Sequence, residues 1–438
     1  MDVIPLDTPE LGDRGYLVHD GAHALVVDPQ RDIDRVEAKA REQGVTITHV
    51  AETHIHNDYV TGGHALARKH DATYLVAAAE QVAFDRHPVH PGDTVAVGTM
   101  TVTALATPGH TEHHLAYVVD HDGRQAIFSG GSLLHGSVGR TDLVDPTRTE
   151  ELTRAQYHSA RTLADRAHPD ATLHPTHGFG SFCSSGPTRT AHTSTIAEQL
   201  RVNHALTDDE TEFVATLIAN LTAYPSYYAH MAPLNRIGPA EPDLTVPRPL
   251  SPGELSRRLD AGEWVVDLRH RVAFATSHLR GAISVEYGRH FTTYLGWTLP
   301  WGDPVTLIGA PDDVTAAIRD LSRIGLDHPD VGADADAGHP TSSYRRATWP
   351  ELRTRLTDPR PLTVLDVRRD DERATTAVPR SLHIPLPRLV STMDSLPNHE
   401  IWVHCASGYR AGIAASLLDR AGHHVVHVDD DWPDTATP

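Results

Sequence analysis

The sequence predicts a multidomain α/β protein, and three observations support that class. Short apolar strands alternate with helical patterns from Asp2 to about Asp120 and again beyond residue 250. The chain of 438 residues is long enough for roughly two to four domains with their own cores. Its hydrophobic content of 39% and charged content of 22% are ordinary for globular proteins. We therefore expect several packed α/β domains.

Net charge and apolar patterning narrow the expected partners and compartment. The formal net charge of −20 would repel a phosphate backbone, so we expect no nucleic-acid partner. No window approaches about eighteen consecutive apolar residues, and the first five residues lack a basic stretch followed by an apolar one. We therefore expect no membrane span, no secretory signal and a cytoplasmic protein. The sequence leaves homo-oligomerisation open.

Shifts in composition divide the chain. Several prolines between residues 233 and 252 mark a linker, and a segment rich in Asp, Gly, Ala and Pro follows residue 327. On either side of that segment two strands end alike, in Trp264-Val-Val-Asp-Leu-Arg269 and in Thr363-Val-Leu-Asp-Val-Arg368. We therefore predict domains over residues 1–245, 250–328 and 345–435, the last two being copies of one α/β unit.

A histidine-rich loop follows the strand predicted at residues 45–51. In Thr53-His-Ile-His-Asn-Asp58 two histidines, His54 and His56, alternate, and Asp58 follows two residues later. Side chains at alternate positions of an extended segment point the same way. Neutral imidazoles with a nearby carboxylate suit divalent transition metals. The pattern predicts a metal site, although chance pairs are also expected in a chain with 32 histidines.

Two more histidines follow apolar strands, where loops deliver functional residues. His110 lies in Thr107-Pro-Gly-His-Thr111, and His177 lies in Pro175-Thr-His-Gly178. Between them a glycine-rich crossing contains Phe128-Ser-Gly-Gly-Ser132 and Gly139-Arg-Thr-Asp142. In this order, these elements resemble the metallo-β-lactamase superfamily, an αβ/βα sandwich whose metal lies between two sheets.

Within that superfamily, residues 1–245 look most like the persulfide dioxygenases. These enzymes use one Fe(II) to oxidise a low-molecular-weight thiol persulfide to sulfite with O2. The resemblance implies that His54 and His110 are iron ligands. It also matches His56, Asp58 and His177 to positions that hold zinc in hydrolase relatives such as glyoxalase II.

Two positions depart from these family patterns. Tyr59 stands where the hydrolases have another histidine, which favours a single ion. Gly131 stands where the dioxygenases have the aspartate that is their third iron ligand. Three arrangements remain open: a three-histidine site of His54, His56 and His110 for Fe(II) or Zn(II), an Asp58 that turns inward, or an emptied site kept as fold.

The two cysteines, Cys183 and Cys405, lie in separate regions, which excludes a disulfide framework. Cys183 follows His177 by six residues, in a loop that should border the metal pocket. A lone cysteine is more often inert packing than a reactive thiol. In this context we predict that Cys183 contacts substrate and accepts or relays a sulfane sulfur.

The second cysteine lies in His404-Cys-Ala-Ser-Gly-Tyr-Arg410, between a strand and a helical pattern. Loop amides and a helix N-terminus stabilise a thiolate at Cys405 and bind an anion, while Arg410 adds a fork for sulfur oxyanions. We predict Cys405 and Arg410 as catalytic residues. The predicted substrate-binding residues of the loop are Ala406, Ser407, Gly408 and Tyr409.

This loop resembles that of a rhodanese, a sulfurtransferase that carries sulfur as a cysteine persulfide. The rival is a cysteine phosphatase, whose loop has five residues between Cys and Arg, whereas four intervene here. In the preceding copy Gly309 aligns with Cys405. Residues 250–328 therefore resemble a silent rhodanese, expected to serve spacing, docking or assembly.

Together these resemblances imply a sulfur-metabolism enzyme with one Fe(II) per chain, or Zn(II) as the alternative. It would oxidise a thiol persulfide to sulfite and exchange sulfur between persulfide, sulfite and thiosulfate at Cys405. One alternative is a thioester hydrolase of the glyoxalase II type fused to a sulfurtransferase. Another is a non-catalytic metallo domain on a sulfur carrier. The sequence does not name the thiol.

Overall fold

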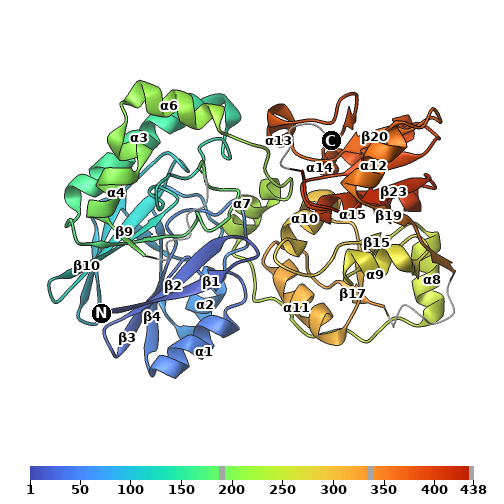
Figure 1. Cartoon of the computed structure of the whole chain (residues 1–438). Helices are drawn as coiled ribbons and strands as arrows, with labels where there is room; N and C mark the ends of the chain where they lie inside the picture. The colour runs from blue at the N-terminus through green and yellow to red at the C-terminus, as the bar shows by residue number, and fades with distance from the viewer. Residues whose placement is uncertain (187–192, 333–339, 434–438) are drawn as a thin grey trace. The chain divides into compact units, whose positions relative to one another are not determined.

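The computed structural model describes residues 1–186, 193–332 and 340–433, and the chain divides into two compact units (Figure 1). Unit 1 comprises residues 1–242 together with 322–325, and unit 2 comprises residues 243–321 and 326–438. Among the helices of the described ranges, none has the length and apolar character needed to cross a membrane.

Unit 1 contains two six-stranded sheets. The first has the order β1-β2-β3-β4-β5-β6, with strands Asp2–Thr8, Asp13–His19, His23–Val27, Thr46–Ala51, Thr73–Ala77 and His87–Val89. The second has the order β12-β11-β10-β9-β8-β7, with strands Ser194–Thr195, Thr172–Pro175, Arg124–Gly130, Leu115–His121, Met100–Ala106 and Thr94–Val97.

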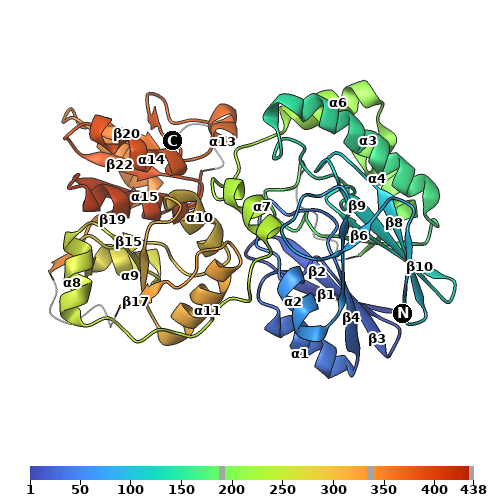
Figure 2. The same cartoon turned by 180° about the vertical axis from the view of Figure 1, so that it is seen from behind.

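The sheets pack face to face because apolar residues alternate along their strands. The core between them contains Val18, Leu25 and Val27 from the first sheet and Val102, Tyr117 and Phe128 from the second. Helices α1 (Asp34–Gln43) and α2 (Gly63–His70) cover the first sheet, and α3 (Thr149–Arg166), α4 (Ile196–Val202), α5 (His204–Thr207) and α6 (Glu210–Ala219) cover the second (Figure 2). The four layers confirm the predicted αβ/βα sandwich. A short helix, η1 (Pro146–Arg148), precedes α3, and α7 (Tyr228–Ile237) ends the unit.

Loops from the two sheets meet at one edge of the sandwich. Strand β4 pairs in parallel with its neighbours β3 and β5, and β10 pairs in parallel with β11. Parallel strands end at the same edge of a sheet, which gathers the loops that follow them. The amide of Leu115 donates to the carbonyl of Thr53 at 2.8 Å and joins the loop after β4 to the start of β9. This edge carries the predicted histidines.

Unit 2 contains two parallel sheets of similar build. The first, β15-β13-β16-β17, includes α8 (Pro252–Asp260), β13 (Trp264–Asp267), α9 (Arg271–Thr276), β15 (Ile283–Ser284), α10 (Phe291–Thr298), β16 (Val305–Ile308), α11 (Pro311–Ser322) and β17 (Asp330–Val331). The second, β19-β23-β22-β20-β21, includes β19 (Arg345–Ala347), α12 (Trp349–Leu356), β20 (Thr363–Asp366), α13 (Asp370–Thr375), β21 (Leu382–His383), α14 (Leu386–Thr392), η2 (Met393–Ser395), β22 (Ile401–His404), α15 (Tyr409–Arg420) and β23 (Val425–Val428). A two-stranded pair, β14 (His278–Leu279) with β18 (Thr341–Ser342), lies beside them.

The two halves of unit 2 repeat the same strand pairing. Strands β13 and β20 end in Asp267 and Asp366, and each aspartate accepts hydrogen bonds from the arginine two residues later. Strand β13 pairs with β16, and β20 with β22, in the same parallel register. Gly309 follows β16 directly and Cys405 follows β22. The register therefore places Gly309 at the position equivalent to Cys405.

Candidate functional site

Three buried histidines converge at the loop edge of unit 1. His54 follows β4, His110 follows β8 and His177 follows β11, and one ligand atom from each lies within 4.8 Å of the others. The Nε2 atoms of His54 and His177 are 3.4 Å apart. Two nitrogens bound tetrahedrally at about 2.1 Å from one metal ion would be separated by about 3.4 Å. The spacing fits a single ion.

The other ring nitrogen of each histidine is already engaged. The partners of these Nδ1 atoms are the Thr53 hydroxyl for His54 at 2.9 Å, the Arg140 carbonyl for His110 at 2.7 Å and Asp13 for His177 at 2.8 Å. The Thr53 hydroxyl gives its own hydrogen to a carboxylate, so it can accept from His54. For His54 and His110, these partners place the ring hydrogen on Nδ1 and leave the Nε2 lone pair free, as in metal-binding histidines. His177 must first lose its Nε2 proton to bind a metal there, because nearby carboxylates raise its pKa.

The chemistry of the donor atoms also fits a metal ion. Burial lowers the pKa of His110 to about 3 and holds the pKa of His54 well below its usual value, so both rings are neutral near pH 7. The Nε2 atom of His110 is buried and has no hydrogen-bond partner within the described ranges. An orphaned buried nitrogen is rare and costly. A divalent ion held by these residues would satisfy it.

His56 and Asp58 form a second group with His177 at the border of the first. The Nε2 atom of His56 lies 3.1 Å from Glu52 and 3.3 Å from Asp28. Burial lowers the pKa of His56, but the two carboxylates outweigh burial and raise it to about 9. Its Nδ1 atom and one oxygen of Asp58 are buried without partners in the described part of the chain. The third member of the compact three-histidine group is therefore His177, which follows β11, and not His56.

Asp13 is a contributor that the sequence analysis missed. Its carboxylate and that of Asp58 lie 2.8 and 3.2 Å from Nδ1 of His177. Burial lowers the pKa of His177, but Asp58 and Asp13 outweigh burial and raise it to about 10. Asp13 opens β2 far from any histidine motif, so no local pattern marks it. Asp28 and Glu52 were detectable, because each is an acidic residue directly after an apolar strand.

Gly131 supplies no carboxylate, and the ring of His110 occupies the adjacent space. A Cβ atom at Gly131 would lie 2.2 Å from Cδ2 and 2.5 Å from Cγ of that ring. A side chain at this position and the observed His110 ring exclude each other. The two-histidine-one-aspartate set implied by the family resemblance is therefore not formed, and His177 stands as the third group beside His54 and His110.

Substituting Gly131 with alanine is expected to displace His110 and to weaken metal binding by about tenfold or more, the size of effect seen when the support of a ligand is lost. Metal content after dialysis, together with a competition titration against a chelator, measures the change. The matched control is Gly253→Ala, because an added Cβ there meets no atom within 4 Å. Unchanged metal affinity in Gly131→Ala would contradict the packing argument.

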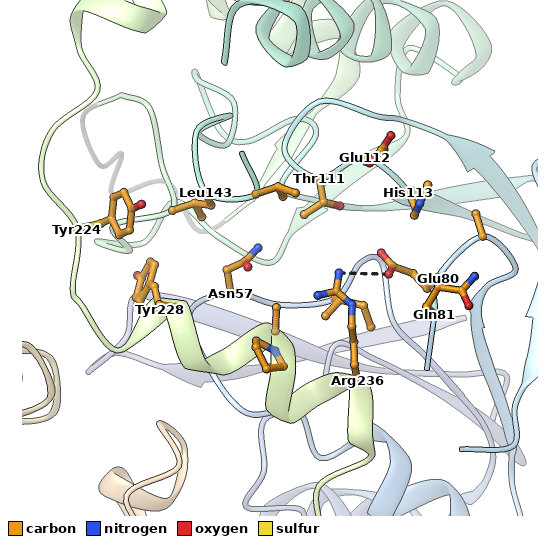
Figure 3. A pocket seen from close by; sticks show the side chains of 16 residues that line it. Asn57, Glu80, Gln81, Thr111, Glu112, His113, Leu143, Tyr224, Tyr228 and Arg236 are labelled. Atoms are coloured by element: carbon orange, nitrogen blue, oxygen red, sulfur yellow. Dashed lines mark hydrogen bonds and ion pairs between the residues drawn. The ribbon is translucent and has the colours of Figure 1, made fainter. Parts of the chain in front are cut away.

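A pocket of about 520 Å³ opens beside the histidine group (Figure 3). Its lining includes Asn57 and Thr111, which are sequence neighbours of the clustered residues, and Tyr228 from α7. The Thr111 hydroxyl is buried and has no partner among the described residues. Farther along the wall Arg236 and Glu80 form an ion pair at 3.5 Å. The volume suits a small molecule, and Thr111 offers it a hydrogen-bonding group.

Cys183 is fully buried, and its amide donates to the hydroxyl of Ser181, which in turn contacts Asp58. Burial holds the pKa of its thiol well above the usual value, and the negative charge of Asp58 adds to the shift. Sulfur acceptors react as thiolates. A buried, protonated thiol is typical of packing, and the relay of sulfane sulfur by Cys183 stays a prediction.

The predicted thiol loop of unit 2 lies between β22 and α15. Gly408 has a φ of 85° and precedes the first turn of α15, and a Cβ atom there would lie 2.1 Å from an oxygen of Asp429. The ring of His427 contacts the Gly408 carbonyl at 2.9 Å, and the amide of Trp432 donates to the Ala406 carbonyl at 2.6 Å. The loop therefore curls at Gly408 and is held from two sides, with Cys405 at its start beside a helix N-terminus.

Arg410 does not present a free guanidinium. Its two terminal nitrogens donate to the two carboxylate oxygens of Glu372 at 2.5 and 2.7 Å. This bidentate pair joins the start of α15 to α13, so we assign Arg410 a positioning role in place of the predicted binding of sulfur oxyanions. Ser407 is exposed on the loop, and the Tyr409 hydroxyl donates to the carbonyl of Glu286 at 3.1 Å.

Comparisons with known proteins agree with this architecture. A model described as rhodanese-like domain matches residues 348–436. A hydroxyacylglutathione hydrolase of Methylobacillus flagellatus is 34% identical over 127 residues, which are 28% of this chain and 49% of the relative. The mitochondrial persulfide dioxygenase ETHE1 of Homo sapiens is 26% identical over 207 residues, which are 47% of this chain and 72% of the relative. The chain spans about half the length of the hydrolases that it matches.

Among solved structures, a metallo-β-lactamase from Staphylococcus aureus subsp. aureus COL aligns with a TM-score of 0.68 and 26% identity. The alignment covers 76% of this chain and 99% of that one. Because unit 1 is little more than half of the chain, the similarity extends into unit 2. The chain therefore combines a metallo-β-lactamase fold in its N-terminal part with a rhodanese-like domain in its C-terminal part.

Proposed function

We propose that the chain is a sulfur-metabolism enzyme that oxidises a low-molecular-weight thiol persulfide to sulfite in unit 1 and transfers sulfur at Cys405 in unit 2. The proposal rests on one observation: a buried three-histidine group beside a small-molecule pocket shares a chain with a rhodanese-type cysteine loop. Both sites would then act on sulfur bonded to sulfur. Sulfite would be the product of one and a sulfur acceptor at the other.

His54, His110 and His177 would hold one Fe(II), with His56 and Asp58 beside it. When bound, Fe(II) would supply the capacity to react with O2. Imidazoles bound to a divalent ion contribute no negative charge, so the three-histidine group would favour an anionic sulfur ligand such as a persulfide. This charge balance is the physical reason that a centre without the family carboxylate still suits a sulfur substrate.

The residues of the pocket would bind and orient the thiol carrier. Thr111, next to His110, and Asn57 both line the pocket and would contact the carrier, and Figure 3 shows them on facing sides. The apolar wall would exclude water from the reacting sulfur. Overall, persulfide, O2 and water would give thiol and sulfite, so the outer sulfur is oxidised and the carrier thiol is released.

In unit 2 the thiolate of Cys405 would attack the outer sulfur of thiosulfate. A new S–S bond forms on Cys405 as the S–S bond of thiosulfate breaks, and sulfite leaves with the electron pair. The reverse step would use sulfite from unit 1 and release thiosulfate. The amides of the curled loop and the N-terminus of α15 would stabilise the anions.

Oxygen uptake tests the proposal for unit 1. The Fe(II)-loaded protein is expected to consume one O2 for each thiol persulfide and to form an equal amount of sulfite, whereas the zinc-loaded protein should consume none. An oxygen electrode and ion chromatography measure the two quantities. If iron-loaded protein forms no sulfite, the dioxygenase proposal fails.

A second candidate is a thioester hydrolase. It is favoured by the sequence identity of 34% to a hydroxyacylglutathione hydrolase and by the fit of three histidines to a zinc ion with an open position. Under the same conditions, zinc-loaded protein that cleaves a glutathione thioester but consumes no O2 with iron would replace the dioxygenase by this hydrolase.

A further inference from the structure

The silent copy of unit 2 contacts the cysteine loop directly. The Tyr409 hydroxyl of the loop donates to the carbonyl of Glu286 at 3.1 Å, and its ring lies 5.8 Å from the rings of both His290 and Tyr294. Tyr294 belongs to α10 of the silent copy. The segment from Glu286, just after β15, to Tyr294 in α10 therefore lies against the loop that begins at Cys405.

Polar contacts fix this placement. Arg271 of the silent copy donates to Asp429 at 2.7 Å and to Glu286 at 3.0 Å. Asp429 in turn lies directly behind Gly408 of the loop. The amide of Ser284 donates to the hydroxyl of Ser416 on α15 at 3.0 Å. Backbone and side chains of both copies thus hold the loop, and the position of Tyr294 relative to it is defined.

The phenol of Tyr294 is available for a ligand. Its hydroxyl has no hydrogen-bond partner within the described residues, although the ring is largely enclosed by Tyr409 and Trp297. Burial raises the pKa of this phenol, so it stays protonated at neutral pH; the charge of Arg410 opposes that shift and the charge of Cys405 adds to it. A protonated phenol that packs against the cysteine loop can donate a hydrogen bond to an anion held there.

We propose that Tyr294, supplied by the silent copy, donates a hydrogen bond to the outer sulfur anion carried on Cys405. This inference rests on the sulfurtransferase part of the proposed function. It assigns the copy without a cysteine a direct part in sulfur transfer, because that copy adds a side-chain donor to the amides of the loop. Arg410 is paired with Glu372, so its guanidinium is not free to bind the persulfide anion. A side-chain donor to that anion would therefore come from outside the loop.

The hydrogen bond would act in both half-reactions. In the first, the thiolate of Cys405 takes the outer sulfur of thiosulfate and sulfite leaves with the electron pair, which places a negative charge on the outer sulfur of the new persulfide. In the second, an acceptor such as cyanide takes that sulfur, the S–S bond breaks and the thiolate returns. No electrons enter or leave overall. Tyr294 would stabilise the charged persulfide between the two steps.

The test compares Tyr294→Phe with Tyr287→Phe in the full-length chain. Tyr287 lies in the same copy, but its hydroxyl donates to Asp320 at 3.0 Å. We expect Tyr294→Phe to lower kcat/KM for thiosulfate by about tenfold, the size expected for losing a hydrogen bond to a charged group. Tyr287→Phe should stay near the wild-type value. Mass spectrometry of the Cys405 peptide should also show faster loss of the added sulfur atom in Tyr294→Phe.

The outcomes separate the two proposals. If the wild-type chain takes up no sulfur from thiosulfate, the sulfurtransferase proposal fails and the role of Tyr294 falls with it. If the wild type is active but Tyr294→Phe matches Tyr287→Phe in kcat/KM and in persulfide lifetime, the role of Tyr294 alone is wrong. Circular dichroism of both variants checks that a lower kcat/KM or a shorter persulfide lifetime does not result from unfolding.

Discussion

Replacing Cys405 with alanine is expected to abolish sulfur transfer from thiosulfate to cyanide. The sulfur atom must be carried covalently between donor and acceptor, and alanine offers no nucleophile. Loss of a catalytic nucleophile lowers the turnover of other enzymes by roughly a thousandfold or more, and we expect a similar loss here. Thiocyanate formation, followed as its iron complex, measures the activity. The Fe(II)-dependent oxygen uptake of unit 1 should persist in this variant.

The other cysteine gives a matched control. Cys183 is fully buried, and its thiol is protonated at neutral pH because burial and Asp58 raise its pKa. Cys183→Ser should therefore keep the full rate of thiocyanate formation. Transfer that survives in Cys405→Ala but disappears in Cys183→Ser would reverse the assignment and support the sulfur-relay hypothesis for Cys183.

The cysteine loop could be predicted from the sequence because its parts are contiguous. The strand before Cys405, the glycine that curls the loop and the helix after it lie within a short stretch. The role of Arg410 could not be predicted in the same way. Its partner Glu372 lies 38 residues earlier, on α13, and only the tertiary fold brings the two side chains together. The sequence of the loop suggested a guanidinium free to bind an anion, whereas in the folded chain this group is paired with Glu372.

The metal site also has a part that could be predicted from the sequence and a part that could not. The motif histidines His54 and His110 follow strands whose ends can be recognised, so their convergence was predictable. The completion of the group was not, because it depends on side-chain direction. His56 turns its Nε2 atom toward Asp28 and Glu52, while His177 turns its own toward His54. The direction of His177 follows from a contact between the two sheets, and that of His56 from carboxylates at the ends of two neighbouring strands of the first sheet.

Gly131 differs from the aspartate of the family pattern, and the structure gives a physical reason for this difference. From the sequence alone, it meant only that one metal ligand was missing. In the structure the ring of His110 lies where a Cβ atom at this position would be. The glycine is therefore compatible with a different ligand set, and the emptied site is not the arrangement that the remaining residues favour. Three converging rings, with the Nε2 atom of His110 buried and without a partner in the described part of the chain, instead describe a group that can hold a metal.

Replacing His110 with alanine is expected to remove the metal from unit 1. The variant loses one of three nitrogen ligands, so we expect metal affinity to fall by more than about 100-fold, beyond the range for loss of an outer partner alone. Metal content by plasma mass spectrometry and a chelator competition titration measure the change. The control is His158→Ala, because the side chain of His158 is 64% exposed on α3. It should bind metal like the wild type.

The same titration decides which histidine completes the group. His177→Ala should resemble His110→Ala, because both remove a ring of the compact cluster. His56→Gln should lose less affinity, since the Nε2 atom of His56 is engaged by two carboxylates and glutamine keeps a donor for them. Alanine is avoided at His56 because it would leave Asp28 and Glu52 buried without their cationic partner, which destabilises folded proteins strongly. If His56→Gln loses the metal while His177→Ala retains it, the ion is held by His54, His56 and His110, and the three-histidine group proposed from the structure is wrong.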